Sequence, residues 1–353
     1  MPSPFFNLYS HGFVRVAVGV PRIRVADPLF NAGQTAALMA DAARGGATLA
    51  LFPELGLSAY TCDDLFHQSA LLEACEAALG VVVQASKTHA ITAVVGLPLR
   101  VDHCLFNCAA VVHDGRVLGV VPKTYLPNYA EFYEARQFNP ADSAVSDDVM
   151  LLGERVPFGA QLLFEAENLP LLKFAAEICE DVWVPIPPSS YAALAGATVL
   201  LNLSASNITI GKSRYRHQLV SLQSARSLAA YLYSSAGMGE STTDLAWDGQ
   251  AIVCENGELL AESPRFVDES HLVTADIDLQ RLAHERMRQT SFGQSAARHR
   301  AQLTGFRTVR FTAHVPAAEV LPRARPVVRF PYVRADITQG DQRWGGGYNI
   351  QGP

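Results

Sequence analysis

The chain has 353 residues, of which 49% are hydrophobic and 18% charged, and its formal net charge is -6. This composition indicates a globular protein with one large or two small domains, and the absence of a basic stripe argues against a nucleic-acid partner. The N-terminal residues lack a charged region followed by an apolar one, and no uninterrupted apolar run approaches membrane-spanning length. We therefore predict neither a secretory signal nor a membrane segment.

Six cysteines are scattered through the chain without paired CxxC elements: Cys62, Cys75, Cys104, Cys108, Cys179 and Cys254. This spacing gives little support to structural zinc or to a disulfide framework. We therefore expect a cytoplasmic protein with reduced thiols, without a metal site and without a cofactor.

The first half of the chain alternates expected strands and helices. Strands are expected at 13–20, 48–52 and 91–97, and helices at 28–44 and 69–87. Two further strands, 106–113 and 116–122, flank Asp114-Gly115, which is a strong hairpin signal. Residues 139–157 are polar and show no period, so we expect a surface loop there.

The second half repeats this alternation and then changes character. Strands are expected at 173–178, 197–203, 230–235, 250–254, 258–262 and 271–277, and helices at 189–195, 212–229 and 279–288. Alternation of this kind predicts an α/β sandwich, which we assign to residues 1–312. Residues 313–353 hold five prolines and the run Gly345-Gly346-Gly347, so we expect an extended arm or a linker remnant.

Three ionisable residues follow apolar strands: Glu54 after TLALF, Lys123 after RVLGVVP and Cys179 after KFAAEI. We expect the three strands to share one sheet, so that the side chains meet at one of its ends. Taken singly, Glu54 and Lys123 are better explained as a loop acid and a surface lysine, and Cys179 is equally well explained as a buried structural cysteine. The ordered set favours a catalytic site.

This set suits acyl transfer from an amide. A thiol attacks a carbonyl as the thiolate, so Cys179 needs a base, and Glu54 can take the proton. Lys123 can place a positive charge beside the oxyanion that forms. Glu54 can then protonate the leaving ammonia and later activate water.

Three segments that carry these residues resemble the nitrilase (carbon–nitrogen hydrolase) superfamily. They are FPELGLSAY at 52–60, VVPKTYLPNYAEFYEARQF at 120–138 and EICEDVWVP at 177–185. The resemblance implies a four-layer α-β-β-α sandwich of the nitrilase type. It also implies a homo-oligomer formed by stacking such sandwiches.

The chain is more similar still to the glutaminase domains of glutamine-dependent NAD+ synthetases, above all in GESTTDLAWDGQ at 239–250. In that family the domain hydrolyses glutamine, and the ammonia passes through a tunnel to a synthetase domain. The resemblance implies that L-glutamine is the substrate, that a Cys thioester forms, and that a separate synthetase or amination partner uses the ammonia in NAD biosynthesis.

The resemblance assigns roles to individual residues. Glu54 becomes the general base, Lys123 the oxyanion stabiliser and Cys179 the nucleophile, with Glu134 as the second glutamate that helps to position Lys123. The positions that match the family's glutamine-binding set are Tyr129, Glu180, Trp183 and Ser206; the family often has Phe where Trp183 stands. For three nearby aromatic residues we favour plain core packing: Tyr60, Phe132 and Tyr133.

One departure from the synthetases is large, because no SGGxDS-type pyrophosphate loop occurs in the sequence. We therefore expect that this chain alone does not adenylate nicotinic acid adenine dinucleotide. It is either an excised domain or a stand-alone protein. Two alternatives to a glutaminase stay open: an amidase or nitrilase for another small substrate, and a non-catalytic subunit that keeps the fold.

Overall fold

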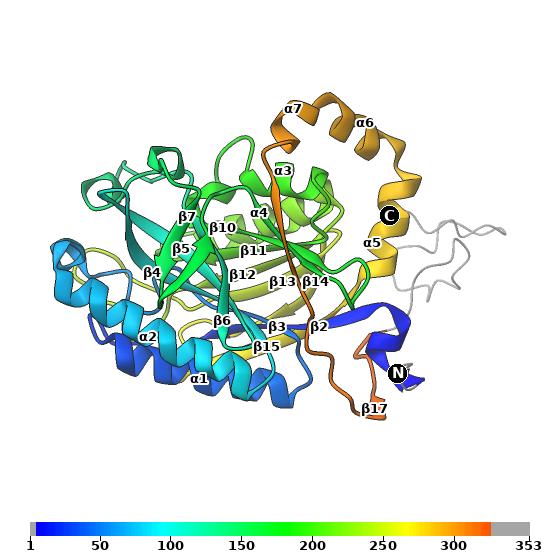
Figure 1. Ribbon diagram of the computed structural model, residues 1–353, viewed down its shortest axis with the longest axis horizontal. Coiled ribbons are helices and arrows are strands. Elements are labelled where there is room, and N and C mark those ends of the chain that lie inside the picture. The colour runs from blue at the N-terminus through cyan, green and yellow to red at the C-terminus, as the bar shows by residue number, and fades with distance from the viewer. Residues whose placement is uncertain (1–4, 326–353) are drawn as a thin grey trace.

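Two β-sheets lie face to face between two layers of helices in the computed structural model, which describes residues 5–325 (Figure 1). The first sheet has six strands in the order β15-β2-β3-β4-β5-β6, in which β2, β3 and β4 are parallel. Their bounds are β15 His271–Asp278, β2 Phe13–Val20, β3 Leu49–Leu51, β4 Thr92–Val101, β5 Cys104–His113 and β6 Arg116–Pro122.

The second sheet has seven strands in the order β14-β13-β12-β11-β10-β9-β16, and its central strands β10, β11 and β12 are parallel. Their bounds are β14 Glu258–Glu262, β13 Ala251–Glu255, β12 Ala230–Ser235, β11 Val199–Ser204, β10 Lys173–Ile178, β9 Leu162–Ala166 and β16 Arg307–Phe311. The expected α/β sandwich of the nitrilase type is confirmed.

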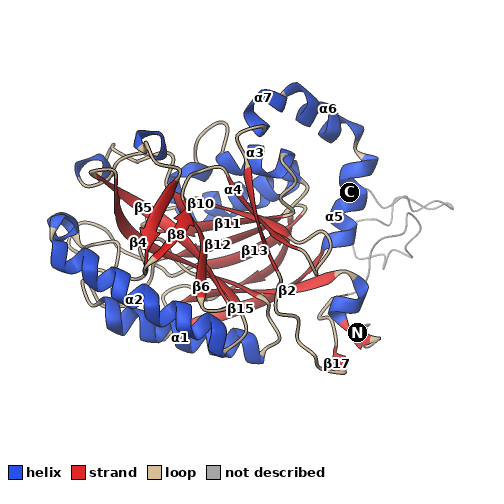
Figure 2. Cartoon of the chain, in the orientation of Figure 1, coloured by secondary structure: helices blue, strands red, loops and turns tan. Residues whose placement is uncertain are grey.

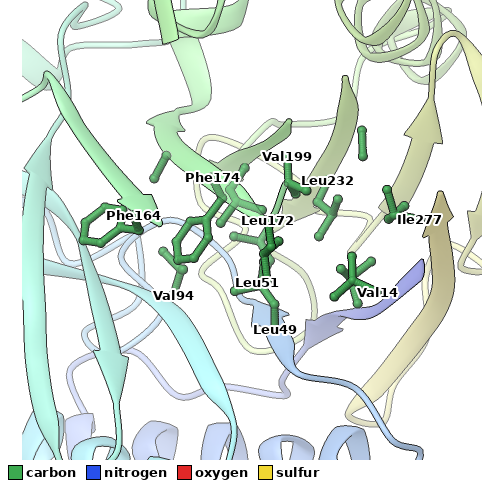
Figure 3. Packing of buried hydrophobic residues seen from close by; sticks show 14 of the residues in the cluster. Val14, Leu49, Leu51, Val94, Phe164, Leu172, Phe174, Val199, Leu232 and Ile277 are labelled. Atoms are coloured by element: carbon green, nitrogen blue, oxygen red, sulfur yellow. The ribbon is translucent and has the colours of Figure 1, made fainter. Parts of the chain in front are cut away.

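The main hydrophobic core lies between the two sheets (Figure 3). Alternate residues of β10 explain its apolar run, because Phe174 and Ile178 face the other sheet whereas Ala175 packs toward the outer helices. Parallel strands that are covered on both faces need apolar residues at every position, which is why they appear in the sequence as continuous apolar runs.

Helices cover the outer face of each sheet (Figure 2). Helices α1 (Pro28–Arg44) and α2 (Ser69–Thr88) pack on the six-stranded sheet, and α3 (Pro188–Leu194) and α4 (Lys212–Ser227) pack on the seven-stranded sheet. Three further helices follow the last strand of the first sheet: α5 Leu279–Arg288, α6 Thr290–Arg298 and α7 Arg300–Leu303. The ends of α1 follow its sequence, since Asp27 caps its N-terminus and Gly45 ends it.

Helix α2 is long and apolar enough to cross a membrane by length and composition alone. Its buried residues, among them Leu79 and Val82, pack against the six-stranded sheet together with α1. A helix that lines the core of a sandwich satisfies the same test, so this feature is only weak support for a membrane span.

The prediction of a loop at 139–157 is wrong, because β7 (Asp148–Leu151) and β8 (Glu154–Pro157) form a hairpin there. Its turn places Leu152 and Gly153 at φ +52° and +82°. Two-residue hairpin turns of this kind prefer Asn-Gly or Asp-Gly, so the leucine conceals the turn in the sequence. The sequence also did not predict β9, β16, α6 and α7.

The described part of the expected arm, residues 313–325, lies along its own chain. Strand β17 (Val320–Leu321) pairs with β1 (Phe6–Asn7), and Arg325 forms an ion pair of 2.9 Å with Glu255. In Figure 1 this segment is the orange trace that leads to β17. Residues 326–353 of the arm lie outside the described part of the chain, and the boundary at 312 stays a prediction.

Candidate active site

Lys123 lies at the centre of a buried cluster of charges. Its side chain is fully buried, and Nζ donates to Glu54 Oε1 at 2.7 Å and to Glu134 Oε1 and Oε2 at 2.7 and 2.8 Å. Glu134 begins a short 3₁₀ turn, Glu134–Arg136, in the loop that follows β6. The structure thus brings the two predicted glutamates onto the predicted lysine.

The two carboxylate oxygens of Glu54 have different surroundings. Oε1 accepts hydrogen bonds from Lys123 and from Asn107 Nδ2, the latter at 2.6 Å. Oε2 is buried and has no hydrogen-bond partner among the described residues. A buried oxygen without a donor has an open hydrogen-bonding position, so Oε2 is the atom at which the predicted base would act.

The backbone that carries Glu54 packs tightly against β4. A Cβ atom added to Gly96 would lie 2.3 Å from Leu55 N and 2.7 Å from Pro53 O. Only glycine fits at this position, because any side chain would displace the turn that presents Glu54.

Cys179 follows β10 and begins a 3₁₀ turn, Cys179–Val182, with φ at +42°. A left-handed backbone at a residue other than glycine stores strain and is frequent at functional sites. The prediction that all three strands share one sheet is wrong: Glu54 and Lys123 follow strands of the six-stranded sheet, whereas Cys179 follows a strand of the seven-stranded sheet. The site forms because the sheets face each other, and Glu54 N donates to Ser204 O across them at 3.3 Å.

Burial and mutual charge set the protonation of the cluster. Burial opposes the charge of Lys123, but Glu134 and Glu54 outweigh it and raise the pKa of the ammonium well above its usual value. Burial raises the pKa of Glu134 to about 7, although Lys123 acts in the opposite direction. Burial and the nearby Glu54 charge raise the pKa of the Cys179 thiol, so the resting cysteine is neutral and needs a base.

Asp181 connects the cysteine turn to the lysine loop. Its carboxylate is buried and accepts from Ile178 N at 2.9 Å and from Tyr125 N at 2.8 Å. One residue therefore holds the backbone just before Cys179 and the backbone just after Lys123. Burial raises the pKa of Asp181 to about 8.

A pocket of about 460 Å³ opens beside Cys179. All four predicted substrate-binding residues line it: Tyr129, Glu180, Trp183 and Ser206. Tyr129 Oη donates to Glu180 Oε1 at 2.8 Å, and the rings of Trp183 and Tyr215 pack with centroids 5.3 Å apart. The pocket thus combines a thiol, a carboxylate and aromatic walls.

Two further charged residues, Glu131 and Lys212, line the same pocket and were not predicted, and Asn207 connects them. Lys212, the first residue of α4, donates to Asn207 Oδ1, and Asn207 Nδ2 donates to Glu131 Oε1 at 2.7 Å. Burial lowers the pKa of Lys212, whose ammonium lies 5.2 Å from the centre of the Phe132 ring. The pocket therefore offers both a cation and carboxylates to a bound molecule.

Core packing is confirmed for Tyr60, which packs against two hydrophobic clusters and the ring of Trp247, and is wrong for Phe132 and Tyr133. Tyr60 Oη donates to Glu134 Oε1 at 2.8 Å, so Tyr60 belongs to the charged cluster. Phe132 is half-buried and lines the pocket, and Tyr133 is exposed and donates to Asp63 at 3.2 Å.

Sequence reasoning also missed Asn107, Asp181 and Lys212. Asn107 lies within an apolar strand, and Asp181 directly follows Glu180 in a buried turn. A polar residue in a buried segment needs a hydrogen-bond partner, and this is the sequence feature that could have indicated Asn107 and Asp181. Among the described residues there is no group of three or more His, Cys, Asp or Glu that could hold a metal ion.

The family model for carbon-nitrogen hydrolases matches residues 15–286, which is most of the chain and includes every residue of the charged cluster. The chain belongs to the carbon–nitrogen hydrolase family. It is accordingly a hydrolytic enzyme that acts on amides, and the predicted catalytic positions Glu54, Lys123 and Cys179 lie inside the matched region. The alternative of a non-catalytic subunit is not supported.

Among known proteins, this carbon–nitrogen hydrolase is 47% identical over 347 residues to a glutamine-dependent NAD(+) synthetase of Mycobacterium tuberculosis. The match covers 98% of this chain and 51% of the relative, so the chain spans about half the length of that protein.

Solved structures agree with this fold. A glutamine-dependent NAD(+) synthetase from Cytophaga hutchinsonii matches with a TM-score of 0.67 and 26% identity over 82% of this chain and 47% of the other. An amidase of the nitrilase superfamily from Nesterenkonia, 20% identical, matches with a TM-score of 0.60 over 82% of this chain and 97% of its own length, which supports the fold alone.

Proposed function

We propose that this carbon–nitrogen hydrolase is a glutaminase, which releases ammonia from L-glutamine through a thioester on Cys179. The observation that carries the proposal is the pocket beside Cys179, where Lys212 and the carboxylates of Glu131 and Glu180 line the same walls. An α-amino acid amide carries one group of each charge, so it can pair with both. The similarity to glutamine-dependent NAD(+) synthetases supports glutamine among such amides.

The first half of the reaction forms the thioester. Glu54 Oε2 takes the thiol proton as Cys179 Sγ attacks the side-chain amide carbon, and an oxyanion forms. Lys123 stabilises this oxyanion. Its ammonium has three N–H groups: one donates to Glu54, one can be shared by the two oxygens of Glu134, and the third can therefore donate to the substrate. Glu54 then gives its proton to the amide nitrogen, the C–N bond breaks and ammonia leaves.

The second half regenerates the enzyme. Glu54 removes a proton from water, and the hydroxide adds to the thioester carbon. The C–S bond breaks, glutamate leaves and the proton on Glu54 returns to the sulfur. Throughout both halves Glu134 stays hydrogen-bonded to Lys123 and holds it in position.

The ammonia would serve a separate synthetase or another amination partner, as the names of the relatives suggest. Assembly into a homo-oligomer and a cytoplasmic location stay predictions. Analytical ultracentrifugation of the purified chain tests the first of these.

The deciding experiment is ammonia release from L-glutamine, measured beside Cys179→Ala. Release with glutamate as co-product, lost in Cys179→Ala, supports the proposal. Turnover of a different amide without turnover of glutamine would keep the chemistry and contradict the substrate. Iodoacetamide labelling is the companion measurement, since a catalytic site predicts selective alkylation of Cys179 among the six cysteines.

A further inference from the structure

Arg216 is a fully buried arginine of α4 that lies outside the catalytic cluster. Its Nη1 donates to both carboxylate oxygens of Asp248 at 3.0 Å and to Gln250 Oε1 at 2.6 Å. A buried guanidinium is costly unless its donors are paired, so this arrangement is a specific one. Asp248 and Gln250 end the segment GESTTDLAWDGQ, whose function the catalytic steps do not explain.

A second donor nitrogen of Arg216 reaches the stretch behind the pocket, whereas Nε is buried without a partner among the described residues. Nη2 donates to the backbone oxygen of Ser206 at 3.3 Å and approaches that of Asn207 at 3.5 Å. These two residues lie in the stretch 205–211, which has neither helix nor strand and joins β11 to α4. Arg216 therefore holds the backbone of the stretch 205–211 through hydrogen bonds to Ser206 and Asn207.

The supported wall positions both kinds of charge in the pocket. Asn207 accepts from Lys212 and donates to Glu131 through its two amide atoms. A shift of the Asn207 backbone would displace both contacts at once. Ala205, at the start of this stretch, contacts the Cys179 thiol through its backbone. Arg216 does not bond to Ala205, and the catalytic groups have further supports on other elements, because Asp181 holds the Cys179 turn and Asn107 holds Glu54.

We propose that Arg216, held by Asp248 and Gln250, is a positioning residue that sets the affinity for a zwitterionic amino acid amide. It acts through Ser206 and Asn207 and leaves the reactivity of the Cys179 thiol unchanged. This inference rests on the proposed function, since it assigns the two charged groups of the substrate to the pocket that Arg216 shapes.

The principal variant is Arg216→Lys, which keeps the charge but loses the planar fork that joins Asp248 to the wall. We expect KM for L-glutamine to rise about tenfold while kcat stays within about threefold, because uniform binding is lost and chemistry is not. The rate constant for alkylation of Cys179 by iodoacetamide, a small neutral amide, should stay at the wild-type value. Arg214→Lys, exposed on the same helix, is the matched control and should change neither quantity.

Protection by L-glutamine against iodoacetamide gives a second measure that needs no turnover. The half-protecting concentration does not depend on the concentration of active protein, so it stays informative for a folded variant that is obtained in low active yield. Gln250→Ala removes one acceptor and keeps the ion pair, and its half-protecting concentration should rise in the same direction as that of Arg216→Lys.

The outcomes separate the two proposals. Wild-type protein that neither releases ammonia from glutamine nor is protected by it would overturn the glutaminase proposal and this inference together. Wild-type protein that is protected, with the same half-protecting concentration in both variants, would overturn only the role of Arg216. Parallel losses of kcat and alkylation rate in Arg216→Lys, with KM unchanged, would also contradict it.

Discussion

Tyr60 Oη donates a hydrogen bond of 2.8 Å to Glu134 Oε1, the same oxygen that accepts from Lys123. Tyr60 follows Glu54 in the chain by one short loop, whereas Glu134 follows Lys123. The bond therefore joins the base segment to the lysine segment through the second glutamate. The ionisation of Glu134 therefore depends on Tyr60, a residue that takes no direct part in the proposed reaction.

Removing this bond by Tyr60→Phe should shift the pH profile. The hydrogen bond from Tyr60 lowers the pKa of Glu134, which burial raises to about 7, so its loss raises that pKa further. We expect the acidic limb of kcat/KM to move to higher pH and kcat/KM at neutral pH to fall by about tenfold. Tyr133→Phe, which breaks only the bond to Asp63, is the control; a limb that moves equally in both variants would contradict the coupling.

Replacing Glu54 by Gln should remove the base and keep the shape of the site. The amide oxygen can still accept from Asn107 and Lys123, but the nitrogen at the Oε2 position cannot take the thiol proton. We expect kcat for ammonia release to fall by about 10²- to 10⁴-fold. The exposed Glu167→Gln serves as control, and a Glu54→Gln enzyme with a tenth of the wild-type kcat would argue for a different base.

Lys123→Met should destabilise the fold as well as abolish turnover. The variant leaves Glu54 and Glu134 buried without their cation, which costs roughly 3–5 kcal/mol of unfolding free energy for a broken buried pair. The loss should be larger at pH 8 than at pH 5. Lys123 lowers the pKa of Glu134, which is about 7 in its presence, so without Lys123 the folded variant keeps a proton on Glu134 above pH 7 that the wild type and the unfolded chain release, and its stability falls further as pH rises.

Urea denaturation at both pH values measures this difference. The exposed Lys87→Met should change the free energy of unfolding by no more than about 0.5 kcal/mol at either pH. Equal losses for Lys123→Met at the two pH values would show that Glu134 does not buffer the cluster.

Asp181 should make stability fall as pH rises. Burial raises its pKa from 3.8 to about 8 in the folded state, so between these values the native protein holds a proton that the unfolded chain releases. Stability from this group is complete below the lower value and is lost as pH rises through the upper one. Asp181→Asn keeps an acceptor and cannot ionise, so its free energy of unfolding should fall less between pH 5 and pH 8 than that of the wild type.

The matched control for this prediction is the exposed Asp142→Asn, whose pH dependence should follow the wild type. An Asp181→Asn slope equal to the wild-type slope would place the titration on another buried acid. Turnover should also fall in Asp181→Asn, because the amide has a single acceptor oxygen and cannot accept from both Tyr125 N and Ile178 N.

Local pattern in the sequence determined the layered architecture. Continuous apolar runs such as the one ending at Ile178 predict strands buried on both faces, and Asp114-Gly115 predicts a hairpin turn that the structure confirms at positive φ. These signals depend only on neighbours in the chain. The order of Glu54, Lys123 and Cys179, each at a strand end, is a local property in the same sense.

Tertiary structure alone decided how those residues meet. The placement of Cys179 on the opposite sheet from Glu54 and Lys123 depends on which strands pair, and contacts between distant segments leave no period in the sequence. The same reason hid the bond between Tyr60 and Glu134 and the support of the pocket by Arg216. The residue types alone therefore indicated the chemistry of the site. The protonation states and hydrogen-bond partners of these residues could be found only in the folded chain, because burial and long-range pairing determine them.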